Sequence, residues 1–121
     1  MNRQAELGWL AGIVDGEGNI SHGGIRVTST DTDILRRCLE VAGGGVISAN
    51  KPDTRGNRKP SWHWRMGWRA GAAEVLADLL PLLCSRKAVS AAWHLYKRGH
   101  IGLQEYEKWL YFRIDELQSR G

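Results

Sequence analysis

The sequence has few of the features that mark disulfide-stabilised, membrane-spanning or disordered proteins. Its two cysteines, Cys38 and Cys84, both fall in apolar helix-like stretches, so we expect buried, reduced thiols and no disulfide. No run approaches the roughly 18 uncharged apolar residues of a spanning helix, and the first residues lack the apolar core of a signal peptide. With 42% hydrophobic and 25% charged residues the chain is too apolar for disorder. We therefore expect a folded cytosolic protein.

Two common ligand-binding patterns are also missing. The four histidines, His22, His63, His94 and His100, show none of the spacings of zinc ligands. The pair Gly16 and Gly18 lacks the third glycine and the preceding strand of a dinucleotide-binding turn. A zinc site and a dinucleotide site are therefore not expected.

The chain does have an excess of basic charge and of tryptophan. Its 121 residues, enough for one domain, include 17 Lys and Arg against 13 Asp and Glu, with six Trp and one Phe. Basic charge with flat side chains is typical of nucleic-acid binding, but six Trp can equally fill a core. Composition alone leaves both interpretations open.

Hydrophobic periodicity predicts an α+β fold in the order helix, hairpin, helix, hairpin, helices. The predicted helices span 4–15, 34–43, 71–83 (interrupted near Pro81), 86–98 and 103–118, and the predicted strands span 19–21, 24–30, 46–51 and 61–69. No linker is long enough to divide the chain, so we expect residues 1–121 to form one domain.

The clearest strand is the stretch 61–69, in which apolar and polar residues alternate strictly. Trp62, Trp64, Met66 and Trp68 fall on one side, and His63, Arg65 and Arg69 on the other. Such alternation is typical of a half-buried strand, so the tryptophans are expected in the core.

Gly8, Gly12 and Gly16 recur every four residues and share one ridge of the first helix. Glycine inside a helix costs roughly 1 kcal/mol relative to alanine, so the ridge needs a compensating close contact. Another helix, of the same chain or of a second copy, could supply it.

Residues 9–18, Trp-Leu-Ala-Gly-Ile-Val-Asp-Gly-Glu-Gly, resemble the signature of the LAGLIDADG homing endonucleases. The similarity continues through 27–31, the triple glycine at 43–45, the Lys-Pro-x-x-x-Trp pattern of 59–64 and Leu-Leu-Pro-Leu-Leu at 79–83. It covers most of the chain, weakens over the last twenty-five residues, and is closest to single-motif members from phages and introns.

The resemblance implies a LAGLIDADG fold, αββαββα with extra C-terminal helices and a saddle-shaped antiparallel sheet. It implies a site-specific double-stranded DNA endonuclease in which this chain is one half of a homodimer. Gly8, Gly12 and Gly16 would form the dimer interface, and Mg²⁺ would be the cofactor. The implied location is the cytoplasm, on the nucleoid of a bacterial or phage-infected host.

The resemblance also implies roles for individual residues. Glu17, the last acid of the motif, would be the metal ligand and catalytic carboxylate, while Asp15 would be a structural group at the helix end. Family members usually place a lysine after the Leu-Leu-Pro element, and here Arg86 falls at that position, with Lys87 adjacent; a shift of one residue would give the role to Lys87. Ser29 matches a polar position that helps hold active-site water.

On this fold the strands would read DNA with outward-facing side chains. The second strand would present Arg26, Thr28 and Thr30, and the fourth His63, Arg65 and Arg69. The connector before the fourth strand would add the cations Lys51, Arg55, Arg58 and Lys59. The first hairpin, with its tip at 22–24, is shorter than is usual in the family, which suggests a shorter or less specific target.

Two other functions stay open. A DNA- or RNA-binding protein of the same fold without cleavage activity, such as a transcription regulator or an intron maturase, is favoured by Arg86 and the short hairpin. A basic cytosolic protein without a nucleic-acid role is the third possibility.

Overall fold

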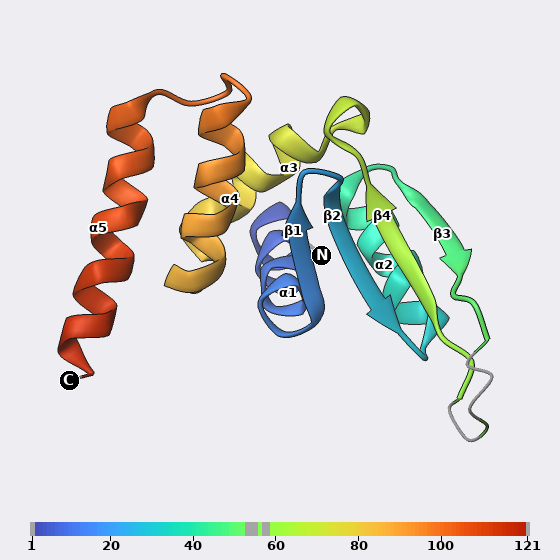
Figure 1. Ribbon diagram of the computed structural model, residues 1–121. Helices are drawn as coiled ribbons and strands as arrows, with labels where there is room; N and C mark the ends of the chain where they lie inside the picture. Colours follow the sequence, from blue (N-terminus) through green and yellow to red (C-terminus); the bar gives the residue numbers. More distant parts are fainter. Residues whose placement is uncertain (1, 53–55, 57–58, 121) are drawn as a thin grey trace.

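Four antiparallel strands form one sheet, and helices pack on one of its faces (Figure 1). The computed structural model describes residues 2–52, 56 and 59–120. The first part of the chain contains α1 (Arg3–Glu17), β1 (Gly18–Ser21), β2 (Gly24–Ser29), α2 (Thr32–Ala42), β3 (Val46–Ala49) and β4 (Trp62–Met66). The 3₁₀ turn Trp68–Ala70, α3 (Ala72–Leu79), the 3₁₀ turn Leu80–Leu82, α4 (Ser85–Lys97) and α5 (Leu103–Ser119) follow. The predicted α+β element order is confirmed.

The strand order is β1-β2-β4-β3, so the second hairpin inserts β4 beside β2. In this register Arg26 lies between Asn19 of β1 and Arg65 of β4. One pair further along, His63 lies between Thr28 of β2 and Ser48 of β3. All six side chains point to the same face, because alternate residues of a strand share a face.

The core lies between the other face of the sheet and the helices. Ile25, Val27, Trp64 and Met66 point into it from β2 and β4, and all four are buried. The helices contribute a larger set that includes Leu10, Val14, Leu35, Cys38, Leu76, Leu79 and Leu95. Trp64, fully buried, donates its indole Nε1–H to the Gly44 carbonyl at 2.9 Å, so the largest core side chain has its one polar group satisfied.

The strand predicted at 61–69 is shorter than expected. β4 ends at Met66, opposite Ile25, because β2 begins at Gly24 and offers no partner beyond it. Gly24 has φ 110° and its Cα faces the Met66 carbonyl, so this position requires glycine. Trp68 and Arg69 therefore lie in the 3₁₀ turn, where Trp68 Nε1 donates to the Ser21 carbonyl at 3.0 Å.

The two cysteines have different environments, which corrects the expectation that both are buried. Cys38 is buried in α2, and burial raises its thiol pKa to about 11. Cys84 is exposed, because the chain leaves the 3₁₀ turn at Leu83 and Cys84 becomes the residue that precedes α4.

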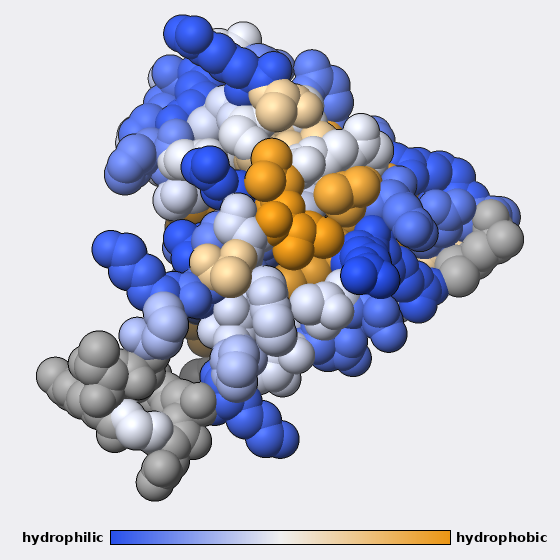
Figure 2. Space-filling model, turned by 90° about the vertical axis from the view of Figure 1, so that its right-hand side faces the viewer, coloured by the Kyte–Doolittle hydropathy of each residue, from blue (hydrophilic) through white to orange (hydrophobic). Residues whose placement is uncertain are grey.

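The last two helices form a pair at the β1 side of the sheet. α5 packs along α4, and α4 in turn contacts β1 (Figure 1). Figure 2 shows the right-hand side of the view in Figure 1, away from this pair, where hydrophilic groups surround a central hydrophobic area. Among the described residues no helix is long and apolar enough to cross a membrane.

Candidate active site and nucleic-acid interface

Glu17 is the last residue of α1 and lines a pocket of about 400 Å³. The other lining residues come from α1, from β2 and the start of α2, and from the residue before β4: Ile13, Val27, Thr28, Ser29, Thr30, Ile34 and Ser61. Within the described part of the chain the exposed Glu17 carboxylate has no hydrogen-bond or ion-pair partner. The pocket thus combines one free carboxylate with four hydroxyl groups, and it brings Glu17 and Ser29 together.

Asp15, two residues before Glu17, makes a structural hydrogen bond. Its carboxylate accepts the backbone N–H of Cys84, the residue before α4, at 3.0 and 3.2 Å, which ties the end of α1 to the start of α4. The two acids of the motif therefore differ in environment, since only Glu17 is available to a ligand.

Lys87 and Arg86, adjacent in the first turn of α4, point to different places. Lys87 donates its Nζ–H to the carbonyl of Gly18, the residue after Glu17. Arg86 is exposed and lines a second pocket, between α4 and α5. Of the two cations, the structure thus brings Lys87 to the acidic end of α1.

Gly18 makes this close approach possible. A side-chain carbon at position 18 would lie 2.7 Å from both Cα and the carbonyl oxygen of Val14, which is too close for any other residue. Gly18 is buried, whereas Glu17 just before it is exposed. The motif thus turns the chain sharply from α1 into β1 at the edge of the pocket.

The exposed face of the sheet carries polar and basic side chains at the centre of β1, β2 and β4. Arg26, Thr28 and Arg65 are exposed on it, and Asn19 completes the row across Arg26. Arg26 and Arg65 are direct cross-strand neighbours, a like-charge pair that lowers stability by a few tenths to about 1 kcal/mol. A bound anion would remove this repulsion.

A polar network holds Arg26 in place. Asn50, just after β3, accepts from the Arg26 guanidinium at 3.2 Å through Oδ1 and donates to Ser61 Oγ at 2.8 Å through Nδ2. The Asn50 Oδ1 also lies 2.6 Å from His63 Nδ1, which donates to it in the tautomer with hydrogen on Nδ1. Desolvation, and then the charges of Arg26 and Arg65, lower the pKa of His63 below its ordinary 6.5.

The remaining predicted DNA-binding residues lie around this face. Thr30 is exposed just beyond β2, and Lys51 and Lys59 are exposed on the connector between β3 and β4. Arg69 is exposed but lies in the 3₁₀ turn beyond the end of β4, not on the sheet as predicted. Arg55 and Arg58 lie outside the described residues.

The three ridge glycines of α1 have open space beside them among the described residues. Gly8, Gly12 and Gly16 are exposed, and a side-chain carbon added at any of them would meet nothing within 4 Å. The close contact that such a ridge implies is therefore not supplied by the described part of the same chain.

A divalent cation is compatible with these donors. Mg²⁺ prefers oxygen ligands, commonly takes one or two carboxylates, and completes its shell with water and substrate phosphate. Glu17 offers one such carboxylate, with the hydroxyls of Ser29 and Thr30 in the same pocket. The described residues contain no group of three or more His, Cys, Asp or Glu that could hold a metal alone, so substrate and water would have to supply the other ligands.

Sequence reasoning missed Asn19, Asn50 and Ser61. Asn19 could have been found by alternation, because it pairs with Arg26 across the first hairpin. Asn50 and Ser61 lie just beyond the strand ends and hydrogen-bond to each other through backbone and side chain. No local pattern predicts that contact, which depends on how β3 and β4 pair.

Comparison with known proteins gives a structural match without a sequence match. No protein-family model matches the chain, and no curated protein does. Among solved structures, the chain is similar to the homing endonuclease I-CvuI, crystallised with the I-CreI target DNA in the presence of Mg, the DNA not being cleaved. The TM-score is 0.53 at 21% identity, and the match covers 74% of this chain and 62% of I-CvuI. With its four-stranded antiparallel sheet and its helices in this order, the chain has the fold of a LAGLIDADG homing endonuclease.

Proposed function

We propose that the protein is a site-specific, metal-dependent endonuclease that cuts double-stranded DNA as a homodimer. The observation that carries this proposal is that the Glu17 carboxylate, without a partner among the described residues, lies in a pocket rich in hydroxyls, while Lys87 donates to the carbonyl of the next residue, Gly18. A carboxylate that has no structural partner, next to a cation and a pocket rich in hydroxyls, is suited to phosphodiester hydrolysis.

The chain's own groups have separate roles in this reaction. Glu17 would hold a divalent cation, and Ser29 and Thr30 orient water in the pocket. Lys87 offsets negative charge that develops on the phosphate. When bound, a divalent cation supplies a Lewis acid that stabilises the attacking and leaving oxygens.

The exposed face of the sheet holds the DNA. Arg26 and Arg65 lie at its centre, where guanidinium groups can make paired hydrogen bonds to guanine edges in the major groove. Lys51 and Lys59, at the margin, are better placed for phosphates. The Arg26–Arg65 pair lowers the stability of the free protein, and neutralisation by DNA would remove that repulsion.

The homodimer follows from the open glycine ridge of α1. Cutting both strands needs two copies of the Glu17 centre, and a pair of ridges in contact would place them side by side. Gly8, Gly12 and Gly16 have space for such an approach of two backbones.

The decisive experiment is a cleavage selection on a randomised DNA library with Mg²⁺, with the Glu17→Gln protein in parallel. The amide keeps the shape of the side chain and removes its charge. We expect the wild-type protein to enrich one cleaved sequence, and Glu17→Gln to cut nothing while still binding that sequence in Ca²⁺. Glu17→Gln cutting at the wild-type rate would show that another group holds the metal.

Binding without cleavage by the wild-type protein would favour the alternative, a DNA- or RNA-binding protein of the same fold. The short tip of the first hairpin, His22 and Gly23, favours this alternative because it offers few groups for reading bases. A parallel selection on RNA would then identify the ligand.

A further inference from the structure

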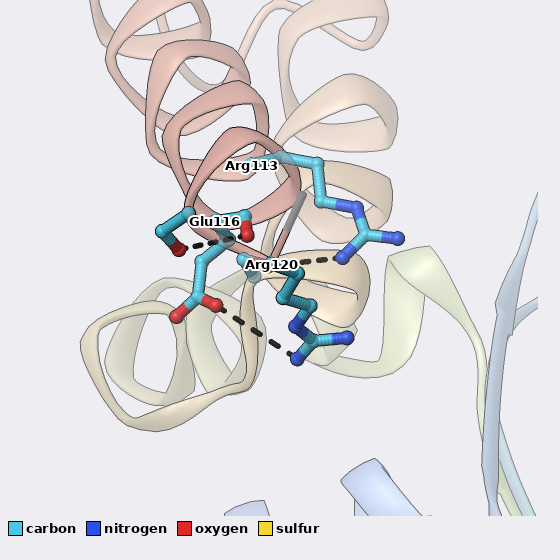
Figure 3. A network of polar contacts seen from close by, with 5 residues as sticks. Arg113, Glu116 and Arg120 are labelled. Carbon is cyan, nitrogen blue, oxygen red and sulfur yellow. Dashed lines mark hydrogen bonds and ion pairs between the residues drawn. The ribbon is translucent and has the colours of Figure 1, made fainter.

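A second pocket, of about 210 Å³, lies where the start of α4 meets the C-terminal end of α5. Three arginines line it, Arg86 from α4 and Arg113 and Arg120 from α5, together with Cys84, Ser85 and Glu116. We call it the arginine pocket. Arg113 and Arg120 extend to the same side of α5, and their guanidinium groups lie one above the other (Figure 3).

The positive charge of this pocket is only partly balanced. Glu116 lies 3.8 Å from Arg120, an exposed ion pair of little strength. Arg113 donates to the neutral Ser85 Oγ at 3.3 Å, and Ser85 is 95% buried, so this guanidinium is held in a fixed place. Arg86 has no partner among the described residues. Three guanidinium groups therefore share one carboxylate.

The arginine pocket adjoins the acidic end of α1. Cys84, in its wall, donates its backbone N–H to Asp15, and Lys87, one residue after Arg86, contacts Gly18. Glu17 lies between these two contacts in the sequence. The case for a ligand rests on the three arginines and not on the end of the helix.

We propose that the arginine pocket binds one backbone phosphate of the DNA, on the strand that Glu17 cleaves and next to the scissile phosphate. This inference rests on the proposed function. Arginine suits such a ligand, because its planar fork matches the oxygens of a phosphate in a bidentate manner. Each strand of B-DNA presents a phosphate about every 3.4 Å of rise, so a scissile phosphate at Glu17 has charged neighbours close by.

Such a contact would be independent of base sequence and would add to the footprint of the sheet. It would also give a function to α5, which packs along α4 and lines the arginine pocket with Arg113 and Arg120. The sheet would then recognise the DNA sequence, and the arginine pocket would hold the cleaved strand in register.

The experiment measures duplex affinity in Ca²⁺ at 50 to 200 mM salt for wild-type protein, Arg113→Gln and Arg113→Lys. The control is Arg36→Gln, an exposed arginine on α2. The homodimer has two arginine pockets, so Arg113→Gln removes two phosphate contacts and lowers the salt slope by about 1.8; the advantage of wild type over Arg113→Gln should therefore shrink about twelve-fold across this range. Arg113→Lys, which keeps the charge, and Arg36→Gln should stay near the wild-type slope. Thermal melting checks that each variant is folded.

A second measurement locates the phosphate. The affinities of wild-type protein and Arg113→Gln are measured for duplexes in which one phosphate at a time is replaced by an uncharged methylphosphonate. We expect one position on each strand, next to the cut, at which neutralisation weakens wild-type binding several-fold and leaves Arg113→Gln unaffected.

Equal salt slopes for wild type and Arg113→Gln, or equal losses for both proteins at every position, would overturn the arginine pocket as a phosphate site. In that case Arg26→Ala would still weaken binding, and the proposed function would stand. A wild-type protein that binds no duplex would instead overturn the proposed function, and this inference with it.

Discussion

Arg26 and Arg65 face each other directly across β2 and β4 on the exposed side of the sheet. The Arg26 guanidinium donates to Asn50 Oδ1 at 3.2 Å and lies 3.2 Å from His63 Nδ1, whereas Arg65 has no polar partner within the described part of the chain. Two cations at this spacing repel in the free protein and are useful once an anion lies over them. Replacing one of the two arginines should therefore raise the free energy of unfolding and weaken DNA binding.

The first prediction tests this trade-off with Arg65→Thr. Threonine suits a strand and removes the repulsion, so the free energy of unfolding should rise by about 0.5 kcal/mol. Affinity for the cognate duplex should fall by about 1 to 3 kcal/mol, with relaxed preference at one position of each half-site. Urea unfolding and duplex titration measure the two effects.

The matched control for that variant is Arg69→Thr. Arg69 lies in the 3₁₀ turn, outside the strand pairing, so its loss should leave stability unchanged and weaken all sequences alike. If Arg65→Thr also weakened cognate and scrambled duplexes equally, the sheet would hold DNA without reading it.

The second prediction separates Lys87 from Arg86. Lys87→Met should slow cleavage by about 10² to 10³, because it removes a charge next to the reacting phosphate. Arg86→Met should slow it by a much smaller factor and act mainly on DNA affinity. Single-turnover cleavage at saturating protein distinguishes these effects, and a larger loss at Arg86 would contradict the assignment.

The third prediction concerns the ridge of α1. An added methyl group at Gly12 meets none of the residues that the structure describes, so Gly12→Ala should stabilise the isolated fold by about 0.5 to 1 kcal/mol. Gly12→Leu should abolish the dimer, because bulk at a backbone contact has no space.

Sedimentation of wild type, Gly12→Leu and the control Ala77→Leu, an exposed position of α3, measures assembly. Ala77→Leu should remain dimeric. A wild-type protein that is monomeric at micromolar concentration with DNA bound would argue against the ridge as the interface.

The fourth prediction is a pH dependence from His63. Its pKa in the folded state is lowered, so below pH 6.5 the unfolded chain binds the proton more readily than the folded chain. The free energy of unfolding therefore decreases as the pH decreases below 6.5. Above pH 6.5 the imidazole is neutral in both states, and this loss of stability is absent. His94, whose pKa is lowered by burial and then by Arg98, Lys97 and His22, contributes in the same direction.

DNA should reverse this effect at His63, because phosphates favour the protonated imidazole. Duplex affinity should therefore rise as pH falls below 6.5, and His63→Gln should flatten the rise. Titrations between pH 5.5 and 8 at constant ionic strength test this, and equal profiles for both proteins would exclude His63 from the interface.

Much of the fold was predictable because it is encoded locally. Asp31 and Gly43 flank α2 as the start and stop signals indicated, and Arg26, Thr28 and Arg65 are exposed as strand alternation predicted. Arg69 was misplaced because alternation in the sequence continues past Met66, whereas pairing stops where β2 begins.

The acidic end of α1 was only partly predictable. The motif singled out Glu17 and Asp15, and alignment to it alone could not decide between Arg86 and Lys87. That decision depends on the rotation of α4, which the Asp15 contact to Cys84 and the packing of Ala88, Ala91 and Leu95 set. Such non-local geometry leaves no mark in a short window of sequence.

The hydrogen bond from Cys84 to Asp15 joins residues 69 positions apart. A contact at this separation carries a loop-closure cost that contacts within a helix or hairpin do not. α4 brings Lys87 to Gly18 in the same docking step. A chain interrupted during synthesis before α4 therefore displays Glu17 without its cation, and only a finished chain can combine the two.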